Sequence, residues 1–382
     1  MVRDQKTSPQ RLGGLVVGNY CHDVLIRDGV VVGETLGGAV AFISAVLDGI
    51  SIPYNLVSKV GPDFAYTTCR SPIVIPTSRT TLFHAHFDSD VDGNGNGDRV
   101  LKRVTVCDPI RASDLDTESK FGFGMAVGVG GEIKPETLER MVDVCDLVLV
   151  DIQALIREFD EDGTVKLVGL KESGFFHLLP RLGFLKASEE EAVYMDVEEV
   201  RQMCCVVVTH GKEGCNVYWK DGELEIKPFE ANQVDPTGAG DSFLGGFVAG
   251  LVHGLLVPDA ALVGNLFGSL TVAQIGLPKF DSRLLQRVKD EVQRRKLQFT
   301  TSHERQDDEL RFVKPAGHEQ FHASLDAAKV IPTCIPQECQ WDLPSPPPRA
   351  VEKAILPQYA GQPKLVLNSI YEEKLHTVED KP

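Results

Sequence analysis

The sequence has little of what a membrane or nucleic-acid partner would require. No apolar run reaches the roughly 18 residues that a membrane-spanning helix needs. Positive charge is also scarce, because 39 Lys and Arg stand against 55 Asp and Glu, which leaves a formal net charge of -16 at pH 7. Coulomb repulsion would oppose the approach of duplex nucleic acid or of an anionic membrane. We therefore expect neither as a partner.

Cysteine is too sparse for a disulfide-stabilised scaffold. The nine cysteines are an odd number scattered through apolar runs of a 382-residue chain, without the density of a small secreted domain. We expect reduced thiols. Residues 1–11, MVRDQKTSPQR, hold no hydrophobic segment before the first strand, and we expect a short N-terminal extension in place of a signal peptide. Both features favour a cytoplasmic location.

The apolar residues are arranged as in an α/β protein. Hydrophobic residues make up 42% of the chain, enough for a large core. Short runs rich in Val, Ile and Leu alternate with helical stretches, which is typical of a mostly parallel sheet with helices on both faces. The clearest strands are almost wholly apolar and end in Gly, Asp, Lys or Thr. They cover residues 15–18, 147–151, 182–186 and 205–209. Open α/β sheets bind ligands at such carboxyl ends.

Two segments break this pattern and predict a small β lid. Residues 24–36 and 80–106 alternate in polarity, and the second contains the turn signal DVDGNGNGD at 90–98. Only about 13 residues separate Asp23 from Gly37, which is room for one hairpin. Pairing of two chains through the lid is therefore less expected than a monomer.

The character of the chain changes beyond Arg295. Acidic clusters and the proline-rich LPSPPPRA at 343–350 replace the periodic pattern. We expect one folded domain over residues 12–297 and a polar, flexible tail over 298–382. His318 and His322 in this tail fit the His-Glu-x-x-His pattern of zinc proteases, but no third ligand is evident, and we expect no catalytic metal there.

The strongest chemical motif is DPTGAGDSF at 235–243, which precedes an apolar, helical run. Pro236 ends the incoming strand, and two glycines permit an unusual backbone path. Unpaired N–H groups at a helix start bind anions, so we expect an anion site here. Asp241 would then meet a phosphate, which suits a carboxylate that accepts a proton. Simple capping of the helix by Asp241 is the alternative.

This motif is similar to the signature of the ribokinase or PfkB family of carbohydrate kinases. The resemblance implies a ribokinase-like three-layer α/β sandwich. It also implies that Asp241 is the base that deprotonates an acceptor hydroxyl, while backbone amides stabilise the transferring phosphoryl group. The implied catalytic residues are Asp241, Gly238, Ala239 and Gly240.

Segments near the start resemble the acceptor side of the family's site. GNYCHD at 18–23 leaves the first strand, and GGA at 37–39 precedes an apolar helix. In the family these segments supply a carboxylate that holds sugar hydroxyls and a glycine pair that lets the substrate approach the backbone. By itself, such a carboxylate is more often a solvated loop residue. The implied substrate-binding residues are Asn19, Asp23, Gly37 and Gly38.

Further segments resemble the nucleotide side. KASEEE at 186–191 is similar to the family's Asn-x-x-Glu motif with Ser188 in the place of Asn, which implies that Glu191 holds Mg²⁺ through water. Three glutamates also make an ordinary acidic helix start. A monovalent cation near Asp235 and Thr237 is a further implication. The implied ATP-binding residues are Ser188, Glu191, Thr209, Gly211, Gly214, Thr237, Gly238, Ala239, Gly240 and Asn265.

Within the family, stretches such as GNYCHDVL, FGMAVGVGGEI and LGFLKASEEEA are most similar to plant inositol kinases. This resemblance implies ATP and Mg²⁺ as cofactors and a small polyol, myo-inositol, as the acceptor. Ribose, fructose and adenosine present the same vicinal hydroxyls and stay open as acceptors. A kinase-like regulatory protein without catalysis is the other alternative, and Ser188 is the one departure in its favour.

Overall fold

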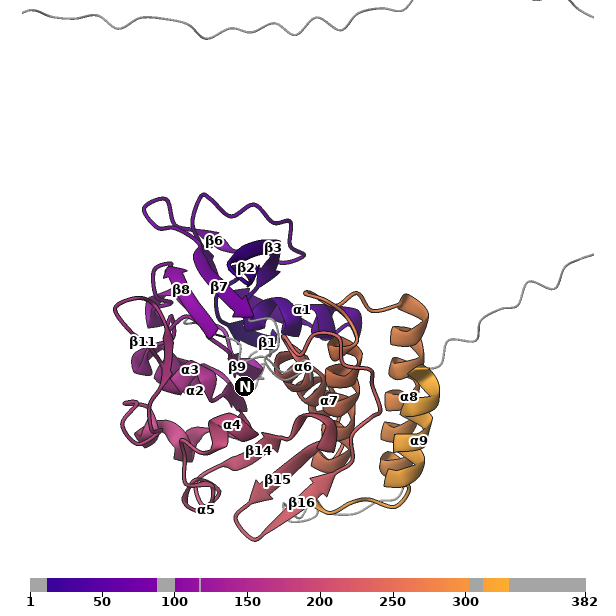
Figure 1. Ribbon diagram of the computed structural model, residues 1–382. Coiled ribbons are helices and arrows are strands. Elements are labelled where there is room, and N and C mark those ends of the chain that lie inside the picture. The colour runs from indigo at the N-terminus through magenta and orange to yellow at the C-terminus, as the bar shows by residue number, and fades with distance from the viewer. Residues whose placement is uncertain (1–11, 88–99, 117, 302–311, 330–382) are drawn as a thin grey trace, which may run out of the picture. The chain divides into compact units, whose positions relative to one another are not determined.

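The computed structural model describes residues 12–87, 100–116, 118–301 and 312–329. Its centre is an eight-stranded sheet in the order β16-β15-β14-β13-β10-β9-β1-β4 (Figure 1). All neighbouring pairs from β4 to β14 run parallel, and β15 and β16 add an antiparallel edge. The strands are β1 (Leu12–Val17), β4 (Tyr54–Val57), β9 (Phe121–Ala126), β10 (Val148–Asp151), β13 (Phe184–Ser188), β14 (Cys205–Thr209), β15 (Cys215–Trp219) and β16 (Gly222–Ile226).

This sheet is buried on both faces. Val16 of β1 belongs to one hydrophobic core and Val17 to another, because successive side chains of a strand point to opposite faces. Helices α1, α6, α7 and α8 contribute to the first core and α2 to the second. The predicted three-layer α/β sandwich is therefore confirmed, and the four predicted strands correspond to β1, β10, β13 and β14. The helices are α1 (Ala39–Gly49), α2 (Pro135–Val144), α3 (Gln153–Ile156), α4 (Glu189–Ala192), α5 (Val197–Val200), α6 (Ala239–Val252), α7 (Val257–Val272), α8 (Ser282–Thr301) and α9 (His318–Lys329).

A four-stranded sheet forms the predicted lid, in the order β3-β2-β7-β8. Both predicted segments contain an antiparallel hairpin, and β2 and β7 join the hairpins in parallel. The first hairpin turns at Asp28 and Gly29, whose φ angles of 49° and 78° suit a two-residue turn. The turn signal at 90–98 lies outside the described residues. The lid strands are β2 (Cys21–Arg27), β3 (Val30–Gly37), β7 (Thr81–Phe87) and β8 (Val100–Thr105).

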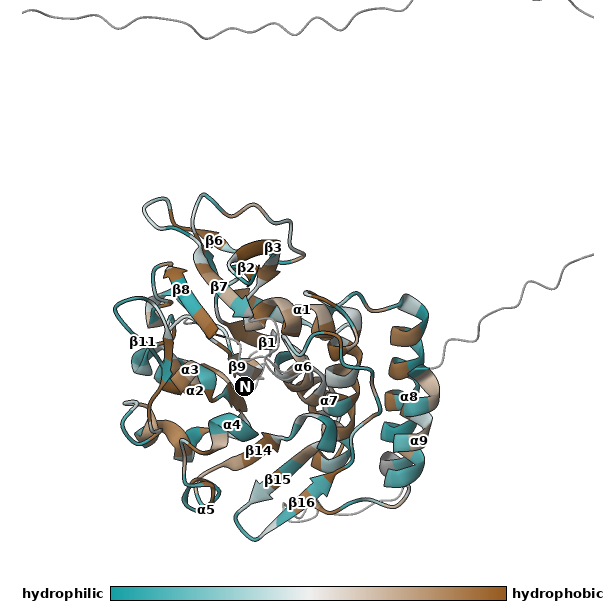
Figure 2. Cartoon of the chain, viewed as in Figure 1, coloured by the Kyte–Doolittle hydropathy of each residue, from teal (hydrophilic) through white to brown (hydrophobic). Residues whose placement is uncertain are grey.

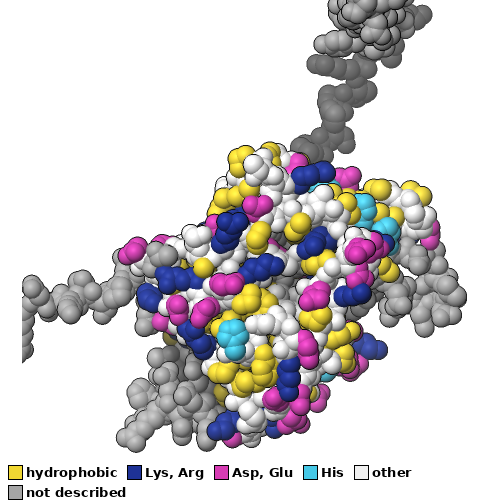
Figure 3. All heavy atoms as spheres, turned by 90° about the vertical axis from the view of Figure 1, so that its left-hand side faces the viewer, with side chains coloured by type: hydrophobic (Ala, Val, Ile, Leu, Met, Phe, Trp, Pro, Cys, Tyr) yellow, Lys and Arg dark blue, Asp and Glu magenta, His cyan; other side chains and the backbone are white. Residues whose placement is uncertain are grey.

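Short elements complete the described chain. Two small sheets pair β5 with β6 and β11 with β12. Figure 3 shows acidic and basic side chains interspersed over one face of the molecule, so the net negative charge is not gathered into a single patch on that face. The remaining elements are β5 (Lys59–Val60), β6 (Ile73–Val74), β11 (Arg157–Phe159), β12 (Val165–Leu167) and the 3₁₀ turns η1 (Ala112–Asp114), η2 (Phe176–Arg181) and η3 (Gly211–Glu213).

The predicted domain end at residue 297 differs from the structure. Helix α8 continues to Thr301, and α9 lies within the segment that was expected to be a flexible tail. Phe321 and Leu325 of α9 are buried in the core that α7 and α8 share. Both helices carry hydrophilic and hydrophobic residues along their length (Figure 2). An amphipathic helix of this kind packs by one face, which outweighs its polar composition.

Two further findings concern expectations from composition. No helix within the described ranges is long and apolar enough to cross a membrane. The structure describes seven of the cysteines, and all seven are free thiols. Six of them are buried, whereas Cys69 is exposed.

Candidate active site

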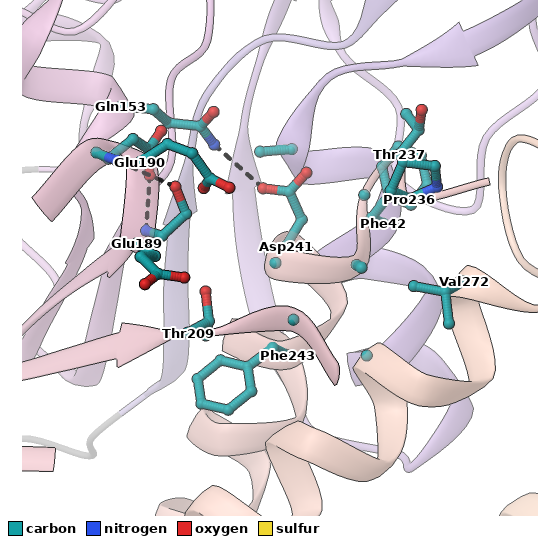
Figure 4. A pocket seen from close by; sticks show the side chains of 18 of the residues that line it. Phe42, Gln153, Glu189, Glu190, Thr209, Pro236, Thr237, Asp241, Phe243 and Val272 are labelled. Carbon is teal, nitrogen blue, oxygen red and sulfur yellow. Dashed lines mark hydrogen bonds between the residues drawn. The ribbon is translucent and has the colours of Figure 1, made fainter. Parts of the chain in front are cut away.

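A cavity of about 1530 Å³ lies at the carboxyl ends of β13 and β14 and at the start of α6. Its lining includes the lid residue Asp23 together with most of the predicted site, and Figure 4 shows part of this lining. Two predicted substrate-binding residues, Asn19 and Gly37, do not line it. The predicted residues that do are Asp23, Gly38, Ser188, Glu191, Thr209, Gly211, Gly214, Thr237, Gly238, Ala239, Gly240, Asp241 and Asn265.

The loop before α6 has a backbone that only glycine fits. Gly238 is the N-cap residue with a φ of 73°, and a Cβ there would lie 2.1 Å from the ring of Phe42. The Asp235 carboxylate fixes the approach to this loop by accepting from the amides of Thr237 (2.9 Å) and Gly276 (3.2 Å). Because the first amides of a helix have no partner within it, the loop offers N–H donors to an anion.

The individual loop amides differ in how available they are. The amide of Ala239 makes one long bond, of 3.3 Å, to the carbonyl of Pro236. The amides of Gly238 and Gly240 donate to no group among the residues that the structure describes. A Cβ on Gly240 would lie 2.7 Å from Nζ of Lys186, so a cation borders the loop. The predicted anion hole therefore has both donors and positive charge.

Asp241 lies in the first turn of α6 and lines the cavity. Its Oδ1 accepts a hydrogen bond from Nε2 of Gln153 at 3.1 Å (Figure 4). Burial raises the pKa of Asp241 above its usual value, although the positive charges of Lys186 and Arg157 oppose this shift. The N-cap is Gly238 and no side chain caps the helix, so capping does not explain this aspartate.

Charged residues that the sequence motifs did not single out surround Asp241. Lys186 and Asp151 form a buried pair with Nζ and Oδ2 3.1 Å apart. Burial raises the pKa of Asp151 to about 7, against the opposing effect of Lys186. Burial would lower the pKa of Lys186, but Asp151, Glu191 and Asp241 together raise it. Lys186 is thus a fixed positive charge at the base of the cavity. The sequence feature that could have pointed to Lys186 is its position at the end of an apolar strand.

Ser188 and Glu191 form a capping box at the start of α4. The Ser188 hydroxyl accepts from the Glu191 amide (3.2 Å), and Oε2 of Glu191 accepts from the Ser188 amide (2.9 Å). Burial would raise the pKa of Glu191, but Lys186 and Arg157 lower it, so the carboxylate is charged. Serine therefore replaces asparagine as an N-cap of equal rank. Glu191 also fits the alternative of an ordinary acidic helix start. Its Oε2 takes part in the capping box, whereas its Oε1 does not.

The described residues contain no cluster of three His, Cys, Asp or Glu side chains that could hold a metal ion by themselves. Mg²⁺ does not need such a cluster, because it usually takes one or two carboxylates together with phosphate oxygens and waters. A charged Glu191 at the cavity fits that requirement.

Asp23 is the predicted substrate-binding residue that the lid contributes to this site. It lies on β2, is 8% exposed and lines the cavity. A Cβ on Gly37 would lie 2.1 Å from the Asp23 carboxylate, so this glycine makes room for the acid and does not itself face the cavity. Asn19 is also a supporting residue. Its side-chain Oδ1 accepts from the backbone amide of Lys59 at 2.7 Å, and its backbone amide donates to the Glu132 carboxylate. Only its Nδ2 lacks a partner in the described structure.

The opposite end of the cavity contains the predicted nucleotide residues. Thr209 ends β14, and its hydroxyl donates to the carbonyl of Ala187 at 3.3 Å. Gly211 and Gly214 have φ angles of 53° and 93° in the turn that follows. Asn265 lines the cavity, but its Nδ2 donates to the carbonyl of Lys227 at 2.9 Å. Its amide nitrogen therefore holds the neighbouring chain segment.

Solved structures with the same fold support this architecture. A pyrophosphate-dependent kinase in the ribokinase family, complexed with a pyrophosphate analogue and myo-inositol, matches with a TM-score of 0.59 and 17% identity over 70% of this chain and 97% of that one. The nucleoside kinase of Methanocaldococcus jannaschii matches with a TM-score of 0.55 and 18% identity over 75% and 99%. At such low identity the likeness concerns the fold, which is that of the ribokinase-like α/β proteins.

Sequence comparisons are more specific. The model of the pfkB family carbohydrate kinases matches residues 177–280. The inositol 3-kinase of Arabidopsis thaliana is 60% identical over 337 residues, which cover 87% of this chain and 92% of the relative. That of Oryza sativa subsp. japonica is 50% identical over 83% of this chain and 82% of the relative. The chain belongs to the pfkB family of carbohydrate kinases.

Proposed function

We propose that this kinase transfers the γ-phosphoryl group of ATP to a hydroxyl of myo-inositol. The observation that carries the proposal is one cavity that joins Asp241 and the amide-rich glycine loop to the lid carboxylate Asp23. Relatives at 50–60% identity over most of their length are named inositol 3-kinases. A loss of catalysis, as in a regulatory relative, is not supported, because Asp241 and both loop glycines are in place.

Asp241 would orient the attacking hydroxyl and then accept its proton. An aspartate with an ordinary pKa of about 3.9 is a weak base toward a free alcohol. Proton transfer must therefore follow the onset of bonding to phosphorus, which acidifies the hydroxyl oxygen. Burial raises the pKa of Asp241, which makes it a stronger base, while Lys186 opposes this shift and favours the charged form. The loop amides and Lys186 would offset the charge on the transferring group.

Asp23 would recognise the polyol. A carboxylate has two oxygens that accept hydrogen bonds from adjacent hydroxyls, which suits a ring of hydroxyls such as inositol. Its position in the lid means that closure of the lid and binding of the acceptor would stabilise each other.

Mg²⁺ is the proposed metal, which the charged Glu191 would hold through water while the donor phosphates would supply further ligands. It would supply positive charge to the phosphates. A monovalent cation near Asp235 and Thr237 is also proposed, and there each oxygen of Asp235 accepts one backbone amide. A monomeric, cytoplasmic enzyme is proposed on composition and on the single short hairpin that follows Asp23.

ADP release by the full chain tests this function. The acceptors would be myo-inositol, ribose, fructose, adenosine and buffer alone, and Asp241→Asn would control for contaminating kinases. We expect release with myo-inositol that the variant loses. Faster release with another acceptor would reassign the substrate, and release with none would favour the regulatory alternative.

A further inference from the structure

Helix α9 contacts a wall of the active-site cavity from outside. The wall is the segment of residues 227–231, which follows β16 and leads on to the glycine loop. We call this segment the donor wall. Four of its residues line the cavity, namely Pro228, Phe229, Glu230 and Ala231. The function proposed above gives α9 no part in the reaction, although it carries the two histidines of the His-Glu-x-x-His pattern.

His322 makes the central contact between α9 and the donor wall. Its Nε2 donates to the carbonyl of Pro228 at 2.9 Å, since a carbonyl oxygen only accepts. Its ring stacks on Phe229 with centroids 4.3 Å apart and planes 16° from parallel. At the ends of the helix, Lys329 donates to the carbonyl of Glu230, and Glu319 pairs with Lys227. Every turn of α9 thus touches the wall.

The rest of α9 is fixed to the protein core. Nδ1 of His318 lies 2.6 Å from Oδ1 of Asp259, and Nε of Arg295 lies 2.7 Å from Oδ2 of the same carboxylate. All three residues are buried, and Phe321 beside them is buried as well. This cluster joins α7, α8 and α9, so α9 holds the wall from a rigid base.

The donor wall is therefore held from two directions. Asn265 of α7 donates to the carbonyl of Lys227, and His322 of α9 donates to the carbonyl of Pro228. These adjacent carbonyls set the path of the backbone where it enters the cavity. A wall held at both peptides cannot widen or collapse without breaking a partly buried hydrogen bond.

The wall lies at the donor end of the cavity. In Figure 1 the lid strands are at the top, β16 is at the bottom, and α6 with its glycine loop lies between them. In phosphoryl transfer, the acceptor hydroxyl, the transferring phosphoryl group and the leaving group of the donor must lie roughly in line. With the acceptor at the lid and the phosphoryl group at the loop, the base and ribose of a nucleotide donor fall against residues 227–231.

We infer that His322 is a positioning residue for the nucleotide donor, because it fixes the donor wall from outside the cavity. The inference rests on the proposed function, because it assumes ATP as the donor. His322 touches no substrate and should leave the chemical step unchanged. Its loss should weaken donor binding while acceptor binding persists.

The test compares three variants of the full chain by steady-state kinetics. His322→Phe keeps an aromatic ring against Phe229 but loses the hydrogen bond, and His322→Ala loses both. His177→Ala is the control, since His177 is an exposed histidine that does not line the cavity. Loss of one hydrogen bond should raise KM for ATP about three- to tenfold. We expect His322→Ala to exceed His322→Phe, with kcat and KM for myo-inositol within about twofold of wild type.

Calorimetric titration with ATP and Mg²⁺ in the absence of acceptor would give the same order of affinities. An unchanged KM for ATP in a folded His322→Phe variant overturns the inference and leaves the proposed function standing. An equal rise in both KM values would also overturn it, since that marks general destabilisation. Failure of wild type and His177→Ala to use ATP at all would instead sink the proposed function, and the inference with it.

Discussion

Two helices of this protein begin at glycines and face the same cavity, yet the residues beside the two starts differ. Gly38 before α1 and Gly238 before α6 are both N-cap residues with positive φ, 86° and 73°, and neither helix has a side-chain cap. The first turn of α1 has no acidic residue, whereas that of α6 carries Asp241. Glycine thus begins the helix in both places, and under the proposed function the side chains around it would decide whether the start receives hydroxyls or a phosphoryl group.

The largest effect should come from removing the acid that distinguishes α6. Asp241→Asn keeps the shape and the contact with Gln153 but cannot accept a proton. We expect kcat to fall by about three orders of magnitude or more, with ATP affinity within about threefold of wild type. Kinetics and calorimetry would measure the two quantities. Retention of more than about a tenth of kcat, a barrier change below about 1.4 kcal/mol, would refute the base assignment.

The next effect should come from closing the backbone of the α6 start. In Gly238→Ala, left-handed backbone costs about 1–2 kcal/mol, and the contact with Phe42 should add about 1–3 kcal/mol. Gly254→Ala is the matched control, because Gly254 has a φ of 84° with nothing within 4 Å of an added Cβ. Urea unfolding should show the larger loss of stability for Gly238→Ala, together with a fall in kcat. Equal losses would mean that the Phe42 contact relaxes freely.

Asp23 is the corresponding test on the side of α1. Asp23→Ala leaves substrate hydroxyls without an acceptor, which costs about 1–3 kcal/mol and should raise KM for myo-inositol roughly 5- to 150-fold. KM for ATP should stay within about twofold. Gly37→Ala should act in the same direction, because its Cβ would displace the Asp23 carboxylate. A similar rise in both KM values would count against recognition of the acceptor by Asp23.

The smallest expected effect concerns pH. Asp241 must be unprotonated to act, so kcat should fall as pH drops through its raised pKa. Lys186 favours the charged form, and Lys186→Met should therefore move this acidic limb to higher pH, by about 1 unit or more. Lys134→Met, at an exposed site outside the cavity, should leave the limb in place. A shift to lower pH would show that Lys186 does not act on Asp241.

The elements that sequence reasoning predicted well are those with local causes. Buried parallel strands need continuous apolar runs, the lid hairpins need alternating polarity, and the α6 start needs glycine at a positive φ. Each of these causes lies within a few consecutive residues. The prediction of Asp241 beside the glycine loop at the start of α6 is of this kind.

The missed features depend on partners that are distant in the chain. Lys186 and Asp151 meet only because β10 and β13 are neighbours, and their positions cannot be read from either segment alone. The roles of Asn19 and Gly37 were predicted as substrate contacts, whereas tertiary packing makes them supports for Lys59 and Asp23. Helix α9 was missed because its few apolar residues become a packing face only when α7 and α8 provide the surface.

The buried thiols have a consequence for how the enzyme would respond to oxidants. Peroxide reacts with thiolates, and burial raises the pKa of both Cys145 and Cys204 to about 12. Such groups stay protonated at neutral pH. Among the described residues, Cys69 is the one exposed thiol and no cysteine lines the cavity. We therefore expect these buried thiols to resist peroxide while the enzyme turns over.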